Sequence, residues 1–259
     1  MAQYDTIGTV GVGARAQIDA GLRAHMNKVY GLMSVAMLIT GAAAWSISGL
    51  AVTTDAAQGV AQIGAGEYLT SFGQTLYASP LKWVVMFLPL VLVFAFSAAI
   101  NRLSVGAAQL FFYVYALAMG VSLSSIFLVF TGTSIAQTFL ITAIAFAGLS
   151  LYGYTTKRDL SGFGTFLVMG LIGLIVASIV NIFLASSALA FAISAIGVLI
   201  FAGLTAYDTQ NIKNTYVQNA AMGNQEWLGK AAIMGALSLY LDFINLFMFL
   251  LQFLGSNRE

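Results

Sequence analysis

The chain has 259 residues, of which 60% are hydrophobic and only 7% charged, whereas a soluble globular domain is about 45–50% apolar and about 25% charged. Its ten basic and nine acidic side chains give a net charge of +1. This excludes a nucleic-acid partner, because such binding needs a concentrated basic patch. The composition instead predicts a multi-spanning membrane protein solvated by the lipid bilayer.

Seven apolar stretches are long enough to cross a bilayer core about 30 Å thick, which takes roughly 20 helical residues. They are Val29–Val52, Leu81–Ile100, Val105–Phe130, Ile135–Tyr152, Phe163–Leu184, Ala188–Asn211 and Ala231–Leu254. Runs such as Val84–Phe96 do not alternate as barrel strands would. We therefore expect an all-α integral membrane protein, a bundle of seven transmembrane helices over residues 29–255, with residues 256–259 as a short tail.

The regions outside the spans predict how the chain is oriented. Basic residues fall in the N-terminal segment and in the second, fourth and sixth connections, at Arg15, Arg23, Lys28, Arg102, Lys157, Arg158, Lys213 and Lys230. Since basic residues favour the cytoplasmic side, we expect the N-terminus to be cytoplasmic and the C-terminus to lie outside.

Two flanking segments carry their own expectations. In residues 1–28, Arg15, Asp19 and Arg23 recur at four-residue spacing, which fits either a short amphipathic helix at the cytoplasmic interface or an extension of the first span. The connection 53–80, rich in Ala, Gly, Gln and Thr, is expected to be a mobile external loop or a loosely ordered cap. The chain has no cysteine, so thiol chemistry is excluded.

Asp242 is the charge least expected from its position. It lies in Leu239–Phe247, LYLDFINLF, 12 residues beyond Lys230 or roughly 18 Å along the helix. A carboxylate at that depth costs about 2.5–3.5 kcal/mol on insertion scales, so it normally has a partner or faces water. Asn245 and Ser238 share its helix face and form a polar stripe.

Asp208, in TAYDTQNI near the end of the sixth span, is the expected partner of Asp242, and Asn211 shares its face. If the carboxyls meet, they cannot both ionise cheaply and should share a proton, which would make a proton sensor or a cation site. The structural alternative is that Asp208 marks a wet helix end and Asp242 is a neutral acid bonded to Asn245. Arg102 is a candidate latch for the acids or simply a cytoplasmic topology residue.

The string LYLDFINLF resembles the seventh-helix signature of the Bax inhibitor-1, or transmembrane Bax inhibitor motif, family in its bacterial branch. The pieces KRDLS (157–161), NIF (181–183) and YDTQNIK (207–213) follow the family pattern in the same order. The resemblance covers about residues 29–255. It implies residence in the bacterial inner membrane and a seven-helix fold with the last helix surrounded by the other six.

The same resemblance implies a pH-dependent calcium leak controlled by an aspartate pair, matched here by Asp208 and Asp242. It also implies an arginine latch, matched by Arg102, although this chain has a single basic residue there. No resident cofactor is expected; transient Ca²⁺ would bind the two aspartates, and Asn211 and Asn245 could add oxygens toward the six to eight that Ca²⁺ takes. Some bacterial relatives instead restrain a membrane-anchored ATP-dependent protease, which is the alternative function.

We expect no enzymatic activity. Residues Leu239–Leu241 stand before Asp242 in place of the glycine-x-glycine that an intramembrane aspartyl protease uses to admit substrate backbone. The only histidine, His25, lies outside the expected spans, which leaves no general base or cluster of nitrogen ligands for serine or zinc chemistry. A rhodopsin-like photoreceptor is excluded because no lysine lies within the seventh span.

Overall fold

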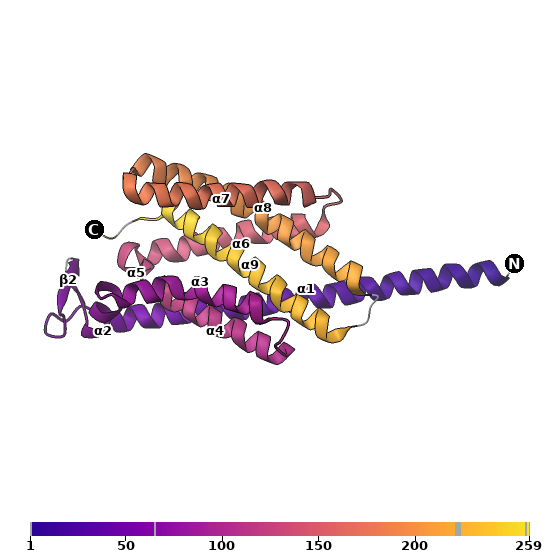
Figure 1. Ribbon diagram of the computed structural model, residues 1–259, viewed down its shortest axis with the longest axis horizontal. Helices are drawn as coiled ribbons and strands as arrows, with labels where there is room; N and C mark the ends of the chain where they lie inside the picture. Colours follow the sequence, from indigo (N-terminus) through magenta and orange to yellow (C-terminus); the bar gives the residue numbers. More distant parts are fainter. Residues whose placement is uncertain (1, 65, 221–223, 257, 259) are drawn as a thin grey trace.

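The computed structural model describes residues 2–64, 66–220, 224–256 and 258, and the side chains from Ile18 onward. The chain is almost entirely helical (Figure 1). The long helices are α1 (Ala2–Ala51), α3 (Leu81–Ala99), α4 (Val105–Leu123), α6 (Gly132–Thr155), α7 (Ser161–Leu184), α8 (Ser187–Asn219) and α9 (Gln225–Leu254). Short α5 (Ile126–Val129) continues the line of α4, so that Val105–Val129 makes one membrane span.

Side-chain caps fix where several of these helices begin. The first N–H groups of a helix have no partner within it, and a Ser, Thr or Asn before the first turn can accept one of their hydrogen bonds. Ser104, Thr131, Ser186 and Asn224 do this for α4, α6, α8 and α9. Each cap stands directly after a connection, so the chain re-enters the bilayer with its backbone donors satisfied.

Helix α9 is the most buried of the seven spans: 67% of the residues in its most apolar stretch are buried inside the protein. It packs against α8 above all, and also against α1, α6 and α4, while α3 packs chiefly on α4 and α7 chiefly on α8. Figure 1 shows α9 running diagonally between the α7–α8 pair and the α3–α4 pair. The last helix is central as predicted, but four helices rather than six make its main contacts.

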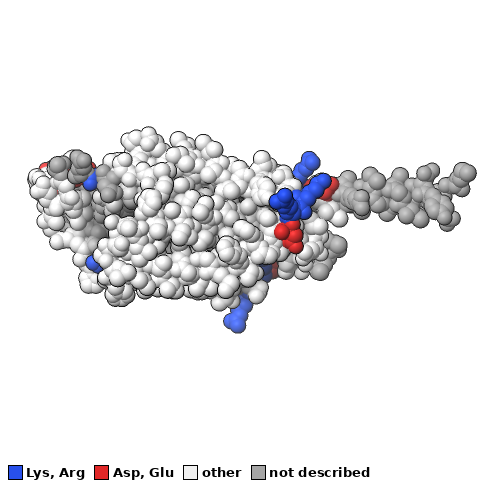
Figure 2. All heavy atoms as spheres, turned by 90° about the horizontal axis from the view of Figure 1, so that it is seen from above, with Lys and Arg blue, Asp and Glu red and all other residues white. Residues whose placement is uncertain are grey.

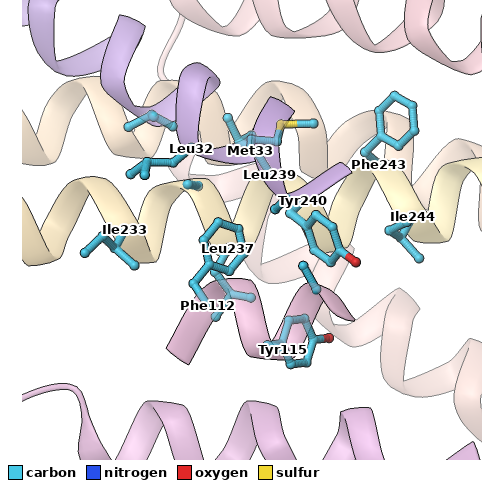
Figure 3. Close-up of a cluster of buried hydrophobic side chains, with 14 of the residues drawn as sticks. Leu32, Met33, Phe112, Tyr115, Ile233, Leu237, Leu239, Tyr240, Phe243 and Ile244 are labelled. Atoms are coloured by element: carbon cyan, nitrogen blue, oxygen red, sulfur yellow. The ribbon is translucent and has the colours of Figure 1, made fainter. Parts of the chain in front are cut away.

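Aromatic side chains on α9 and α4 form the core beside α1. Tyr240 contacts the rings of Phe112 and Tyr115 edge-on, with centroids 5.8 and 5.9 Å away. Figure 3 shows this cluster, with Leu32 and Met33 of α1 close to α9. The Tyr240 hydroxyl reaches the Thr40 hydroxyl at 2.7 Å, and Thr40 also donates toward the Ala116 carbonyl. The buried polar ends are therefore satisfied within the bundle, as burial in an apolar core requires.

The outside of the bundle is an apolar band. Large side chains such as Ile182 and Phe183 are 76% and 85% exposed, and a band of this kind marks a surface that faces lipid rather than water. Figure 2 shows the basic side chains gathered mainly at the end from which α1 projects, with a long uncharged surface beyond them. All seven spans are long and apolar enough to cross a membrane.

The connection expected to be a loop or loose cap is a small ordered sheet. Strands β1 (Val52–Thr53), β2 (Ala61–Gly64) and β3 (Glu67–Leu69) pair antiparallel in the order β1-β3-β2. The short helix α2 (Ser71–Gly73) and the π-helical turn η1 (Gln74–Ala78) lead from the sheet into α3. At the other end of the chain, Arg258 forms an ion pair with Glu67 at 2.6 Å, which ties the C-terminal tail to this sheet.

Several helices are longer than the hydropathy of the sequence indicates, α1 and α8 most of all. The sixth span was expected to end at Asn211, but α8 continues to Asn219. At the N-terminus, α1 is one unbroken helix from Ala2 to Ala51, so residues 2–28 extend the first span rather than form a separate helix. Polar residues beyond the apolar stretch stay helical because the next turns still gain backbone hydrogen bonds.

Helices α6 and α8 approach closely at Gly153, because a Cβ atom there would collide with the backbone carbonyl of Ala206. We expect Gly153→Ala to lower the free energy of unfolding by about 1–3 kcal/mol through overpacking. Gly148→Ala on the same helix meets nothing within 4 Å and should be neutral or slightly stabilising. Thermal unfolding of both variants in detergent tests this; equal melting temperatures would contradict the close packing.

Candidate functional site

Asp242 lies near the middle of α9, roughly 25 Å along the helix from Gln225. Its side chain is 4% exposed. The oxygen Oδ2 is buried and receives no hydrogen bond from an N–H or O–H donor in the described part of the chain. An acid this deep in an apolar bundle needs a compensating neighbour or a proton.

The neighbour of Asp242 is Asp208 on α8. The two carboxyl groups line the same cavity and lie close enough to interact, and Asp208 is half-buried. An ionised carboxylate has only acceptor oxygens, so a hydrogen bond between two carboxyl groups needs a proton on one of them. The extension of α8 to Asn219 explains the contact, because Asp208 lies well inside that helix rather than at its end.

The pair lines a cavity of about 590 Å³ enclosed by α7, α8 and α9. Ser178, Tyr207, Ser238 and Asn245 supply the other polar side chains of its wall, and the rest is apolar. Asp208 and Asp242 are the only acidic or basic groups in this described lining. Ile175, Ile179 and Ile182 of the α7 wall are exposed on the outside of the bundle, so the cavity lies on the lipid-facing side.

Of the three polar residues expected near the acid pair, two line its cavity and one does not. Ser238 and Asn245 line the cavity, but the Asn245 amide donates to the Leu241 carbonyl at 2.8 Å rather than serving Asp242. Asn211 was expected on the face of Asp208 and is exposed outside the cavity lining. Asp208 is the last α8 residue of the lining, and Asn211 lies about 4.5 Å further along the helix, beyond the end of the cavity.

The latch expected from Arg102 is absent from the structure. Arg102 lies in the turn between α3 and α4, is exposed, and forms no ion pair with an acid among the described residues. The physical reason is its place in the bundle. Helix α3 packs chiefly on α4, so the turn at its end is held away from the middle of α9.

A second polar group, directly after Asp208 in the chain, ties α8 to its neighbours. The Ser150 hydroxyl on α6 contacts the Thr209 hydroxyl at 2.9 Å and the Tyr30 hydroxyl of α1 at 2.5 Å. Gln210 accepts from the Leu160 N–H and donates to the Arg158 carbonyl, both at 2.8 Å. These residues were not among the predicted site residues. Thr209 and Gln210 stand within TAYDTQNI, and their position directly after Asp208 is the signal in the sequence that points to them.

The residues that could hold a metal are few. No group of three or more His, Cys, Asp or Glu side chains gathers within the described ranges, and two carboxyl groups offer at most four of the six to eight oxygens that Ca²⁺ takes. His25 is not outside the spans as expected: it is buried in α1 with its ring 4.8 Å from that of Tyr216. It stands alone there and adds no ligand to the pair.

Seven apolar spans, of which the last is central and carries one member of a buried acid pair, define a multi-pass membrane protein. The family model described as inhibitor of apoptosis-promoting Bax1 matches residues 22–259. The chain belongs to the Bax inhibitor-1 family, as its sequence motifs indicated.

Relatives in several bacteria cover nearly the whole chain. It is 46% identical to an uncharacterized protein of Caulobacter vibrioides over 246 residues, which are 95% of this chain and 94% of the relative. It is 44% identical to the inner membrane protein YbhL of Escherichia coli over 243 residues, 93% and 95% of the two chains. The protein is therefore a multi-pass protein of the bacterial inner membrane.

Gln210 should matter for the stability of the connection between α6 and α7. Gln210→Leu removes both of its bonds and leaves the Leu160 N–H and the Arg158 carbonyl without them, at a cost of about 1–3 kcal/mol. Gln218→Leu, at an exposed position of the same helix, is the matched control. Thermal unfolding and proteolysis within residues 156–160 measure the effect; identical behaviour of the two variants would show that the Gln210 bonds contribute nothing.

Proposed function

We propose that this protein is a cation leak of the inner membrane, with Ca²⁺ as the permeant ion and the Asp208–Asp242 pair as its proton-sensitive element. The observation that carries the proposal is the contact between two carboxyl groups from adjacent spans, one of them 4% exposed. Intramembrane acids are rare and normally mark ion or proton pathways.

The pair couples protonation to the packing of two helices. With one shared proton the carboxyls bond α8 to α9; with none, two like charges stand in contact; with two, the attraction of the pair for a cation is lost. Each change of protonation alters the contact between the most extensively packed helix pair of the bundle. A switch needs this combination of a local charge change and a packed element that responds to it.

A permeating cation would bind the acid pair only transiently. The carboxylate oxygens, with Ser238 and Asn245 nearby in the cavity wall, form an incomplete coordination shell. Conduction requires binding that is weak enough for the ion to leave, so an incomplete shell suits a leak better than a storage site. The proposal includes no bond-making chemistry and no resident cofactor.

Asp208→Asn and Asp242→Asn should each abolish the pH dependence of Ca²⁺ flux into liposomes that contain a trapped calcium dye. An amide keeps the size and can still donate to the remaining carboxyl, while the coupled titration is gone. The flux is measured between about pH 6 and about pH 8. In each variant, the Ca²⁺ flux at the lower pH divided by that at the higher pH should be roughly one.

Asp159→Asn is the control for this experiment. Asp159 lies in the connection between α6 and α7, where hydrogen bonds from the Ser161 hydroxyl and N–H hold its pKa below the usual value. It therefore stays ionised throughout the test, and its loss should leave the pH profile unchanged. Unaltered pH dependence in both pair variants would overturn the proposal.

A second candidate function is restraint of a membrane-anchored ATP-dependent protease through the N-terminal helix. The observation that favours it is the continuation of α1 well beyond the end of the bundle (Figure 1). A projecting helix can present a face to a partner without disturbing the spans.

Deleting residues 2–17 separates this function from the leak. Among the described side chains of α1, burial in the core begins at Leu22, so the truncated protein should fold with an unchanged melting temperature. We expect the deletion to abolish co-purification of the protease while calcium flux persists. Undiminished recovery of the protease would exclude the N-terminal helix as its binding site.

A further inference from the structure

Another cavity lies on a different side of α9 from the acid pair. It has a volume of about 1040 Å³ and runs between α1 and α6, with Phe243 of α9 in its wall. On α1 it extends from Arg23 to Ala42, and on α6 from Tyr154 back to Phe139. These α1 residues span roughly 28 Å, close to the thickness of a bilayer core.

This groove opens toward lipid. Leu38 and Leu151 in its walls are 73% and 63% exposed. The helices α1 and α6 do not pack extensively along it, and the contact between the Tyr30 and Ser150 hydroxyls joins its two walls. Its volume is at the upper end of the range of small-molecule sites, about 300–1,000 Å³.

The polarity of the groove changes along its length. Arg23, Asn27 and Tyr154 lie at the end from which α1 projects, whereas Met37, Gly41 and Phe139 line the opposite end. Arg23 is the only charged side chain in the described lining, and no described acid lies within ion-pair distance of it. A second cation is close by, since Lys213 donates to the Tyr154 carbonyl at 2.7 Å.

We propose that the groove between α1 and α6 binds one anionic glycerophospholipid of the leaflet on the N-terminal side, with its phosphate at Arg23 and an acyl chain along Met37 and Gly41. A phospholipid is a membrane component with one charged end and a long apolar remainder, which matches the groove in charge and in direction. An extended peptide would leave backbone N–H and C=O groups unpaired against these apolar walls, so it fits poorly.

The acyl part of the site is tested by filling the groove. A Cβ atom at Gly41 meets nothing within 4 Å, so Gly41→Trp adds bulk to the groove without a clash at its first atom. Gly31→Trp is the matched control, because Gly31 is equally open on the same helix but lies outside the lining. Ala147→Trp from the opposite wall provides a second variant should Gly41→Trp fail to fold.

The headgroup part is tested by charge. Arg23→Ala should reduce the preference for phosphatidylglycerol over phosphatidylcholine roughly fivefold, the effect of one basic residue beside anionic lipid. Lys28→Ala, an exposed basic position on α1 outside the lining, should leave the preference unchanged.

The measurement is native mass spectrometry of the full chain from mixed vesicles of phosphatidylglycerol and phosphatidylcholine. We expect one retained phosphatidylglycerol in the wild type and in both controls, loss of bound lipid in the tryptophan variants, and loss of selectivity in Arg23→Ala. Equal retention of the two lipids by the wild type, or full retention by the tryptophan variants, would overturn the proposal. So would a dimer that Gly41→Trp converts to monomer, since the groove would then be an interface between copies.

Discussion

A carboxyl group in the middle of a membrane helix must be solvated by protein, and the arrangement of α9 meets that requirement for Asp242. The helix packs against α1, α4, α6 and α8, which leaves Asp242 only 4% exposed and places it beside Asp208 in the cavity wall. The remaining helices then cover the bundle: α3 lies on α4 and α7 on α8. Had α9 been peripheral, the same carboxyl would face hydrocarbon at a cost of several kcal/mol.

The other polar side chains of the spans are satisfied in two different ways. Many hydroxyls bond to the carbonyl four residues earlier in their own helix, as Thr142, Ser178 and Thr205 do. Such bonds satisfy the group without linking helices. Bonds between helices are concentrated elsewhere, near Ser150, Thr209 and Gln210. The α6–α8 contact is therefore fixed by directed bonds. Helices α8 and α9 are joined by the bond from the Ser194 hydroxyl to the Gln252 side-chain carbonyl at 3.1 Å and by the acid pair.

The sequence was sufficient for the number and order of the spans, because about 20 consecutive apolar residues have few other uses than crossing a bilayer. It also pointed to Asp242 as buried, since no topological role explains a charge there. It could not show that α8 continues to Asn219, because hydropathy measures apolar length rather than helix length. The sheet near Glu67 was missed for a related reason: strands of two to four residues carry almost no periodic signal.

The errors around the site concern where the cavity ends and how the helices pack. Asn211 was assigned to the face of Asp208 from its spacing alone, but the α8 part of the cavity wall ends at Asp208. Arg102 was expected near the acid pair because it lies at the cytoplasmic end of its span. Which helix a span packs against, however, is decided by side chains along its whole length. The bond from Ser150 to Thr209 joins residues 59 positions apart, and no local pattern in one sequence encodes such a pairing.

Consecutive residues of α9 line the acid-pair cavity and the groove between α1 and α6. Asp242 lines the one that holds the acid pair, and Phe243, about 100° around the helix, lines the groove between α1 and α6. A displacement of α9 that separates Asp242 from Asp208 must also move Phe243 in the groove wall. A molecule in the groove can bind one arrangement of α9 more tightly than the other. By linkage, it then shifts the protonation equilibrium of the pair by at most the difference between its binding free energies for the two arrangements. The pair would then shift the affinity of the groove by the same factor, so lipid composition and proton concentration would act on one helix.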